Sequence, residues 1–110
     1  MAYDDALADR VRAQLAGEPD LTERKMFGGI AWLLGGNLAV GVRGEDLMVR
    51  VGADGAPAAL ERPHARRSYM GEREMKGWIL VAPDGVAEDA DLADWVRRGT
   101  EYARSLPAKA

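Results

Sequence analysis

The chain has 110 residues, 47% of them hydrophobic and none of them cysteine. This length and composition predict a single domain, residues 1–110, with its own apolar core, and they exclude disulfides and cysteine-ligated zinc. Lys and Arg number 15 against 18 Asp and Glu, for a formal net charge of −3. Proteins that bind DNA on their own usually carry a basic face, so direct DNA binding is not expected.

The N-terminus is acidic (Met1-Ala2-Tyr3-Asp4-Asp5) and lacks the apolar stretch of a signal peptide. No apolar run approaches the roughly 20 residues that a membrane-spanning helix needs. We therefore expect a cytoplasmic protein with no membrane segment.

Residues 4–16 are predicted to form the first helix. Leu7, Val11 and Leu15 recur every four residues, which places them on one face. Aspartates near the start suit the positive end of the helix dipole, and Gly17 and Pro19 end the helix.

Four strands are predicted to follow, at residues 22–27, 30–34, 38–42 and 47–51. Gly35-Gly36-Asn37 is a strong hairpin signal between the second and third of them. Gly44-Glu45 turns the chain into the fourth strand, which gives an antiparallel meander.

Alternation along the third and fourth strands divides their side chains between two faces. One face is bulky and apolar and is the predicted core side: Leu38, Val40, Val42, Leu47, Val49 and Val51. The opposite face has low relief: Ala39, Gly41, Arg43, Met48 and Arg50. Three occupants remain open for it: a helix, a ligand, or a second copy of the chain in a homodimer.

In the second half, residues 54–62 are predicted to form a short helix, and 68–70 with 76–82 a hairpin around Gly71-Glu72. Pro83-Asp84-Gly85 is a turn signal. The last helix is predicted from apolar residues at i, i+3, i+4 and i+7 spacing: Leu92, Trp95, Val96, Gly99, Tyr102, Ala103 and Leu106. Its acidic start suits the helix dipole, although it is also a candidate face for a basic partner.

These elements predict an α+β fold. A mostly antiparallel sheet meander carries the N-terminal and C-terminal helices packed on one face. The tail after Pro107 is expected to fray.

Two glycine-containing motifs stand out, Met26-Phe27-Gly28-Gly29 and Met75-Lys76-Gly77-Trp78. Adjacent glycines in an apolar run cost backbone entropy, which indicates a bend or a close backbone approach. A backbone amide nest that faces an anion or a partner peptide is the functional alternative.

With Lys25 before the first motif and Ile30-Ala31-Trp32 after it, this stretch resembles the signature of the TfoX/Sxy competence-regulator family, in its N-terminal domain. The resemblance runs from Tyr3 to Leu106 and includes Asp46-Leu47-Met48-Val49-Arg50-Val51. The signature positions are Lys25, Met26, Phe27, Gly28, Gly29, Arg50, Met75, Lys76 and Gly77.

The resemblance implies an α+β fold and a regulatory role exercised with a transcriptional activator at its promoters. It brings no established catalytic residues. Full-length members pair this domain with a C-terminal helical domain, whereas the resemblance here is to the N-terminal domain, as in a stand-alone single-domain member; the role that it implies is that of a competence-type co-regulator of transcription.

The inventory of reactive residues is small. His64 is the only histidine, so one chain has no His-rich metal site. The serines and threonines (Thr22, Ser68, Thr100 and Ser105) do not lie in a Gly-x-Ser-x-Gly motif. We expect no catalytic residues, metal or cofactor; a hydrolase with two carboxylates is the alternative, although no pair is marked by its context.

Four basic residues are candidates for an anion or partner site: Arg50, His64, Arg67 and Lys76. Arg50 lies in an apolar strand, where a buried guanidinium needs a carboxylate or an anion, and a structural salt bridge is the competing interpretation. His64 is more simply a solvated loop residue, and Lys76 a strand-end charge beside a buried Trp78. The alternative hypothesis joins all four in one anion-binding cleft.

The leading hypothesis is a non-enzymatic regulatory or protein-interaction module, such as a transcription-related co-regulator that acts through a protein partner. The alternative is a small-molecule or anion-binding domain that uses the four basic residues.

Overall fold

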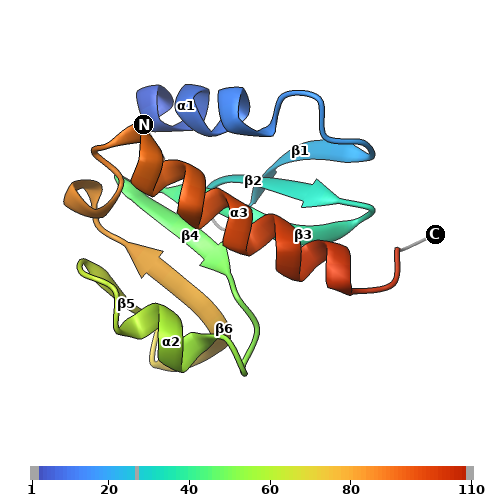
Figure 1. Cartoon of the computed structure of the whole chain (residues 1–110). Helices are drawn as coiled ribbons and strands as arrows, with labels where there is room; N and C mark the ends of the chain where they lie inside the picture. The colour runs from blue at the N-terminus through green and yellow to red at the C-terminus, as the bar shows by residue number, and fades with distance from the viewer. Residues whose placement is uncertain (1–2, 27, 109–110) are drawn as a thin grey trace.

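This computed structural model describes residues 3–26 and 28–108 of the chain (Figure 1). They contain six strands, three α-helices and one short 3₁₀-helix, joined by turns and loops. In chain order they are α1 (Asp5–Leu15), β1 (Leu21–Met26), β2 (Gly29–Leu34), β3 (Asn37–Arg43), β4 (Asp46–Arg50), α2 (Ala56–Leu60), β5 (Ala65–Met70), β6 (Arg73–Val81), η1 (Pro83–Gly85) and α3 (Asp89–Ser105). The predicted α+β fold is confirmed. The largest shifts in bounds are at β5 and β6, which both begin three residues earlier than predicted.

The strands form one antiparallel sheet in the order β1-β2-β3-β4-β6-β5. The first four strands are the predicted meander, and β5 and β6 are the predicted hairpin. The hairpin is added to the sheet through β6, which pairs with β4, so β5 is the outermost strand. The sheet is therefore open, with β1 at one edge and β5 at the other.

Helices α1 and α3 cross the same face of the sheet, as predicted (Figure 1). Leu7 and Val11 of α1 and Trp95 of α3 share one buried cluster with Val40 and Ile79 of the sheet. Burial of such side chains is the main favourable term in folding. The same cluster includes two alanines of α2, so all three helices pack on the same face of the sheet, with the core between them and the strands.

A β-bulge in β3 overturns part of the predicted division between faces. Trp32 pairs with Val40 but Leu33 pairs with Leu38, which leaves Ala39 as an extra residue. One extra residue reverses the alternation beyond it. Ala39 is consequently buried against Ala103 of α3 rather than on the far face. The predictions for Ala39 and for Leu38, which is half-buried outside the core cluster, were wrong.

The far face around Gly41 and Met48 is withdrawn from solvent within the single chain, together with Ala31, Leu33 and Leu80. It therefore offers little apolar surface for a second subunit. The homodimer stays a prediction without support from this face.

The chain directly after α3 is held as far as Ala108, while residues 109–110, the rest of the tail that was expected to fray, lie outside the described residues. The side-chain amide of Asn37, only 3% exposed, donates a hydrogen bond of 2.9 Å to the carbonyl of Pro107. Ala108 lies against Gly35 in the same β2–β3 turn. A buried amide needs such a partner, and Pro107 supplies it.

Within the described ranges, no helix has the length and apolar character needed to cross a membrane.

Candidate functional site

The second glycine motif forms a large bulge in β6. Arg67 pairs with Ile79 and Tyr69 with Glu74, so the four residues from Met75 to Trp78 stand opposite a single residue of β5. Gly77 takes a left-handed conformation within it, with φ of +83°. Its carbonyl accepts the backbone N–H groups of Val51 at 2.8 Å and of Gly52 at 3.1 Å. The bulge therefore anchors the loop that leads from β4 to α2.

Glycine is required on both sides of this junction. A Cβ at Gly77 would lie 3.0 to 3.1 Å from backbone atoms of Gly52 and Ala53, which cannot move aside. Gly52 also has positive φ, +79°, and a Cβ there would overlap the ring of Tyr102 in α3. Left-handed φ favours glycine. The motif thus positions β6, the β4–α2 loop and α3 against one another.

Arg67 and Lys76 meet at a pocket beside this bulge. The pocket has a volume of about 220 Å³ and is lined by Ala53, Ala56, Arg67, Glu74, Lys76 and Gly77. Arg67 forms an ion pair with Glu74 at 2.9 Å, and both side chains are partly exposed. Two cations against one carboxylate leave the pocket with an excess of positive charge.

Arg50 is directed elsewhere. Its guanidinium lies 5.4 Å from the ring centroid of Tyr102, a cation–π geometry. Its Nη1 is 3.5 Å from the carbonyl oxygen of Leu38. No ion pair of Arg50 occurs in the part of the chain that the structure describes, so the predicted salt bridge is not found. Tyr102 in turn lines an open groove between α2 and α3 of about 370 Å³, together with Ala58 and Arg98.

His64 has a structural setting of its own. It takes a left-handed conformation, φ +67°, in the turn before β5, and its carbonyl accepts the N–H of Ala82 at 3.0 Å. Its Cβ lies against Gly85 of η1. The four predicted residues therefore separate: Arg67 and Lys76 share a pocket, whereas Arg50 turns toward α3 and His64 toward η1.

The first glycine motif lies at the β1–β2 turn. Gly28 has φ of +73°, and a Cβ at Gly29 would overlap the carbonyl oxygen of Val42 in β3. The glycines thus allow a tight turn and a close approach of two strands. Lys25 and Met26 pair with the start of β2, and Phe27 lies outside the described residues.

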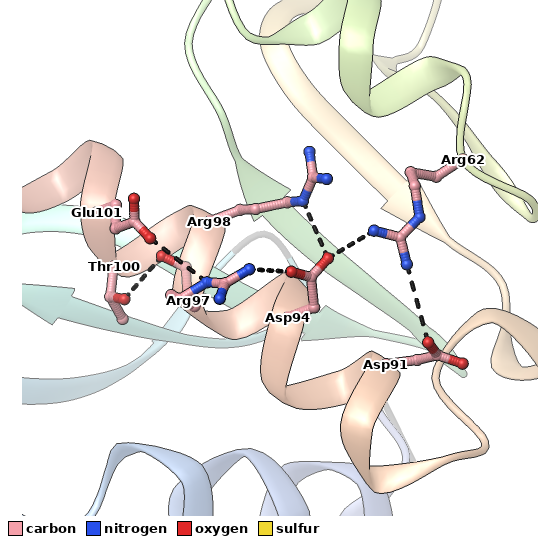
Figure 2. A network of polar contacts seen from close by, with 7 residues as sticks. All are labelled: Arg62, Asp91, Asp94, Arg97, Arg98, Thr100 and Glu101. Atoms are coloured by element: carbon pink, nitrogen blue, oxygen red, sulfur yellow. Dashed lines mark hydrogen bonds and ion pairs between the residues drawn. The ribbon is translucent and has the colours of Figure 1, made fainter.

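Sequence reasoning missed the ionic cluster that joins the turn after α2 to α3 (Figure 2). Asp94 accepts hydrogen bonds from Arg62 at 2.6 Å, from Arg98 at 3.1 Å and from Arg97. The guanidinium groups of Arg62 and Arg98 lie 5.4 and 5.3 Å from the ring centroid of Trp95. The spacing of Asp94 with Arg97 and Arg98 signals local helix pairs, but nothing in the sequence signals Arg62.

This setting lowers the pKa of Asp94. Partial burial raises that pKa, but hydrogen bonds from Arg62 and Arg98 and their charges outweigh it. The acidic start of α3 therefore has partners inside the chain.

A second carboxylate is held in the same way. Glu23 of β1 accepts hydrogen bonds from Arg12 at 2.7 Å and from the indole of Trp32 at 2.9 Å. The Arg12 hydrogen bond is the main reason why the pKa of Glu23 is lowered, against the opposing effect of burial. Both carboxylates are thus kept ionised in ion pairs, whereas a general acid at neutral pH needs a raised pKa.

The side chains at these sites are suited to binding charged groups. Across the described ranges, no three His, Cys, Asp or Glu residues gather closely enough to hold a metal ion. The pocket and the groove offer guanidinium, ammonium and aromatic groups, which recognise carboxylates and other anions.

The family model of the TfoX N-terminal domain matches residues 13–103 of the chain. The match covers both glycine motifs, the bulge in β6 and the pocket. Neither the curated proteins nor the solved structures give a significant match.

Proposed function

This chain belongs to the TfoX N-terminal domain family, and on that premise we propose that it is a non-enzymatic regulatory module that acts by binding another protein. The family is regulatory, and the partner we propose first is a transcriptional activator. Direct DNA binding is not part of the proposal, because the net charge is −3.

The observation that carries the proposal is the position of the Met75–Trp78 motif, at a junction of three elements and beside the pocket of Arg67 and Lys76. Its glycine supports a junction of β6, the β4–α2 loop and α3, and next to that junction stand the exposed cations of Arg67 and Lys76. A guanidinium stays charged in proteins, so it binds acidic groups well but does not exchange protons in a reaction. A rigid support under charged, solvent-facing side chains suits recognition.

Cross-linking in living cells, followed by affinity purification and mass spectrometry, tests this proposal. We expect the wild-type chain to recover a defined protein partner reproducibly. A matched variant, Gly77→Val, should lose that partner because it disrupts the junction, and circular dichroism would report whether it still folds. Recovery of no partner under any growth condition would contradict the proposal.

A second candidate function is the binding of a small anion in the pocket of Arg67 and Lys76. A ligand that binds only the folded state raises its melting temperature. Thermal shifts with phosphate, nucleotides and dicarboxylates at millimolar concentration test it. No shift with any of them, or the same shift in Lys76→Ala, would rule it out.

A further inference from the structure

Strand β5 (Ala65–Met70) is an open edge of the sheet. It pairs with β6 on one side, and no other strand of the described residues pairs with it. An edge strand presents unpaired backbone groups that another strand can use. β5 also carries Tyr69, which is 46% exposed although it is large and aromatic.

Two arginines flank this edge on both faces. Arg66 and Arg67 are consecutive, so their side chains point to opposite faces of the sheet. Arg66 forms an ion pair of 2.7 Å with Asp46 of β4, and Arg67 one of 2.9 Å with Glu74. The arginine side chains remain 53% and 52% exposed. Ion pairs this exposed are weak, so each guanidinium is able to take a further carboxylate.

The segment around β5 has an excess of positive charge, whereas the chain as a whole is negatively charged. Residues 61–76 contain five Lys and Arg and three Glu, whereas the whole chain has a net charge of −3. The other edge strand, β1 (Leu21–Met26), also carries two consecutive cations, Arg24 and Lys25, beside a Glu23 that is engaged by Arg12 and Trp32. β5 differs from it in the pocket of Arg67 and Lys76 beside the strand and in its exposed Tyr69. Of the two edges, β5 is therefore the better fit for an acidic partner.

A second copy of this chain fits the β5 edge poorly. Pairing of β5 with β5 would bring Arg66 and Arg67 of two molecules together, and like charges on neighbouring strands are unfavourable. An acidic strand has no such penalty.

We propose that the free edge of β5 binds an extended acidic segment of a partner protein as an added strand. The inference rests on the proposed function and specifies its contact. Backbone hydrogen bonds along the edge supply affinity, and alternate side chains supply specificity. Partner side chains on the helix side of the sheet reach the pocket of Arg67 and Lys76, whose volume of about 220 Å³ is large enough for a carboxylate side chain. Partner side chains on the other side of the sheet meet Arg66, and Tyr69 adds apolar contact.

A synthetic probe tests the inference with the whole chain. The probe is a blocked peptide of about eight residues in which Glu and Val alternate, titrated into isotope-labelled protein by NMR. We expect the largest shifts at amides of β5. The double variant R66E/R67E should weaken binding at least tenfold, whereas R24E/K25E on β1 should leave it within about twofold. The matched peptide of alternating Lys and Val should not bind.

Backbone recognition has its own test, which leaves the protein unchanged. N-methylation of alternate residues along one edge of the peptide removes its donors to β5 but keeps its charge. We expect this peptide to bind at least tenfold more weakly. Equal binding by the methylated peptide, shifts centred on β1 or the α2–α3 groove, no binding at millimolar peptide, or self-association through β5 would each overturn the inference.

Cellular cross-linking separates this inference from the proposed function. If R66E/R67E still recovers the partner of the wild-type chain, the β5 contact is wrong while the interaction function stands. If the wild-type chain recovers no partner, the proposed function itself fails.

Discussion

The ring of Tyr102 occupies the space that a side chain at Gly52 would need. Gly52 in turn donates its backbone N–H to the carbonyl of Gly77 at 3.1 Å. Through these contacts α3, the β4–α2 loop and the bulge of β6 are held together without any large side chain in the loop.

Gly52→Ala should destabilise the chain by roughly 2 to 4 kcal/mol, because it combines left-handed φ with steric overlap against Tyr102. Urea denaturation measures the loss. Gly44→Ala is the matched control, since Gly44 has φ of +61° but open space around its Cβ position. It should cost only about 1 to 2 kcal/mol. Equal losses in the two variants would show that the Tyr102 contact contributes nothing.

Asp94→Asn should lower the free energy of unfolding at pH 7 by about 1 to 2 kcal/mol. The carboxylate of Asp94 accepts hydrogen bonds from Arg62 and Arg98, and hydrogen bonds to charged groups are the stronger ones. Asp91→Asn is the control, because Asp91 is 3.8 Å from Arg62. Its loss should stay below about 0.5 kcal/mol. A similar loss in both variants would place the stabilisation in general charge balance rather than in the cluster around Asp94.

Stability should fall with acid in a window set by Asp94 and Glu23. Their pKa values are lowered from ordinary values of 3.8 and 4.5. A carboxyl whose pKa is lower in the folded state adds stability above the unfolded-state pKa, and that stability disappears as pH falls through the folded-state value. The free energy of unfolding, measured in urea from pH 6 to about pH 2, should therefore decline less steeply in D94N/E23Q than in the wild-type chain. Parallel curves would refute this assignment.

Asn37→Ala should cost about 1 kcal/mol and release the end of the chain, because it removes the hydrogen bond from the buried amide to Pro107. Amide hydrogen exchange should then increase at Ala108. Deletion of residues 107–110 should cost a similar amount, and its effect should not add to that of N37A. Additive losses would mean that Asn37 stabilises the fold in some other way.

Much of the fold was predictable because its signals are local. The apolar spacing of Leu92, Trp95, Val96 and Gly99 indicated α3, and all four are buried. The hairpin signal Gly35-Gly36-Asn37 lies at the β2–β3 turn. The candidate site was less predictable: of the four basic residues that the cleft hypothesis joined, Arg67 and Lys76 line one pocket, whereas Arg50 and His64 lie elsewhere, and Glu74 was not considered.

Periodicity and turn residues, both properties of short stretches of chain, were thus enough to determine the elements, the meander and the side of the sheet that the helices cover. They did not determine where one extra residue reverses the alternation, as at Ala39, because a bulge depends on the neighbouring strand and on α3. Nor did they pair Arg62 with Asp94, or Tyr102 with Gly52. Those contacts join residues 32 and 50 positions apart, and only the packing of α2, α3 and β6 brings them within reach.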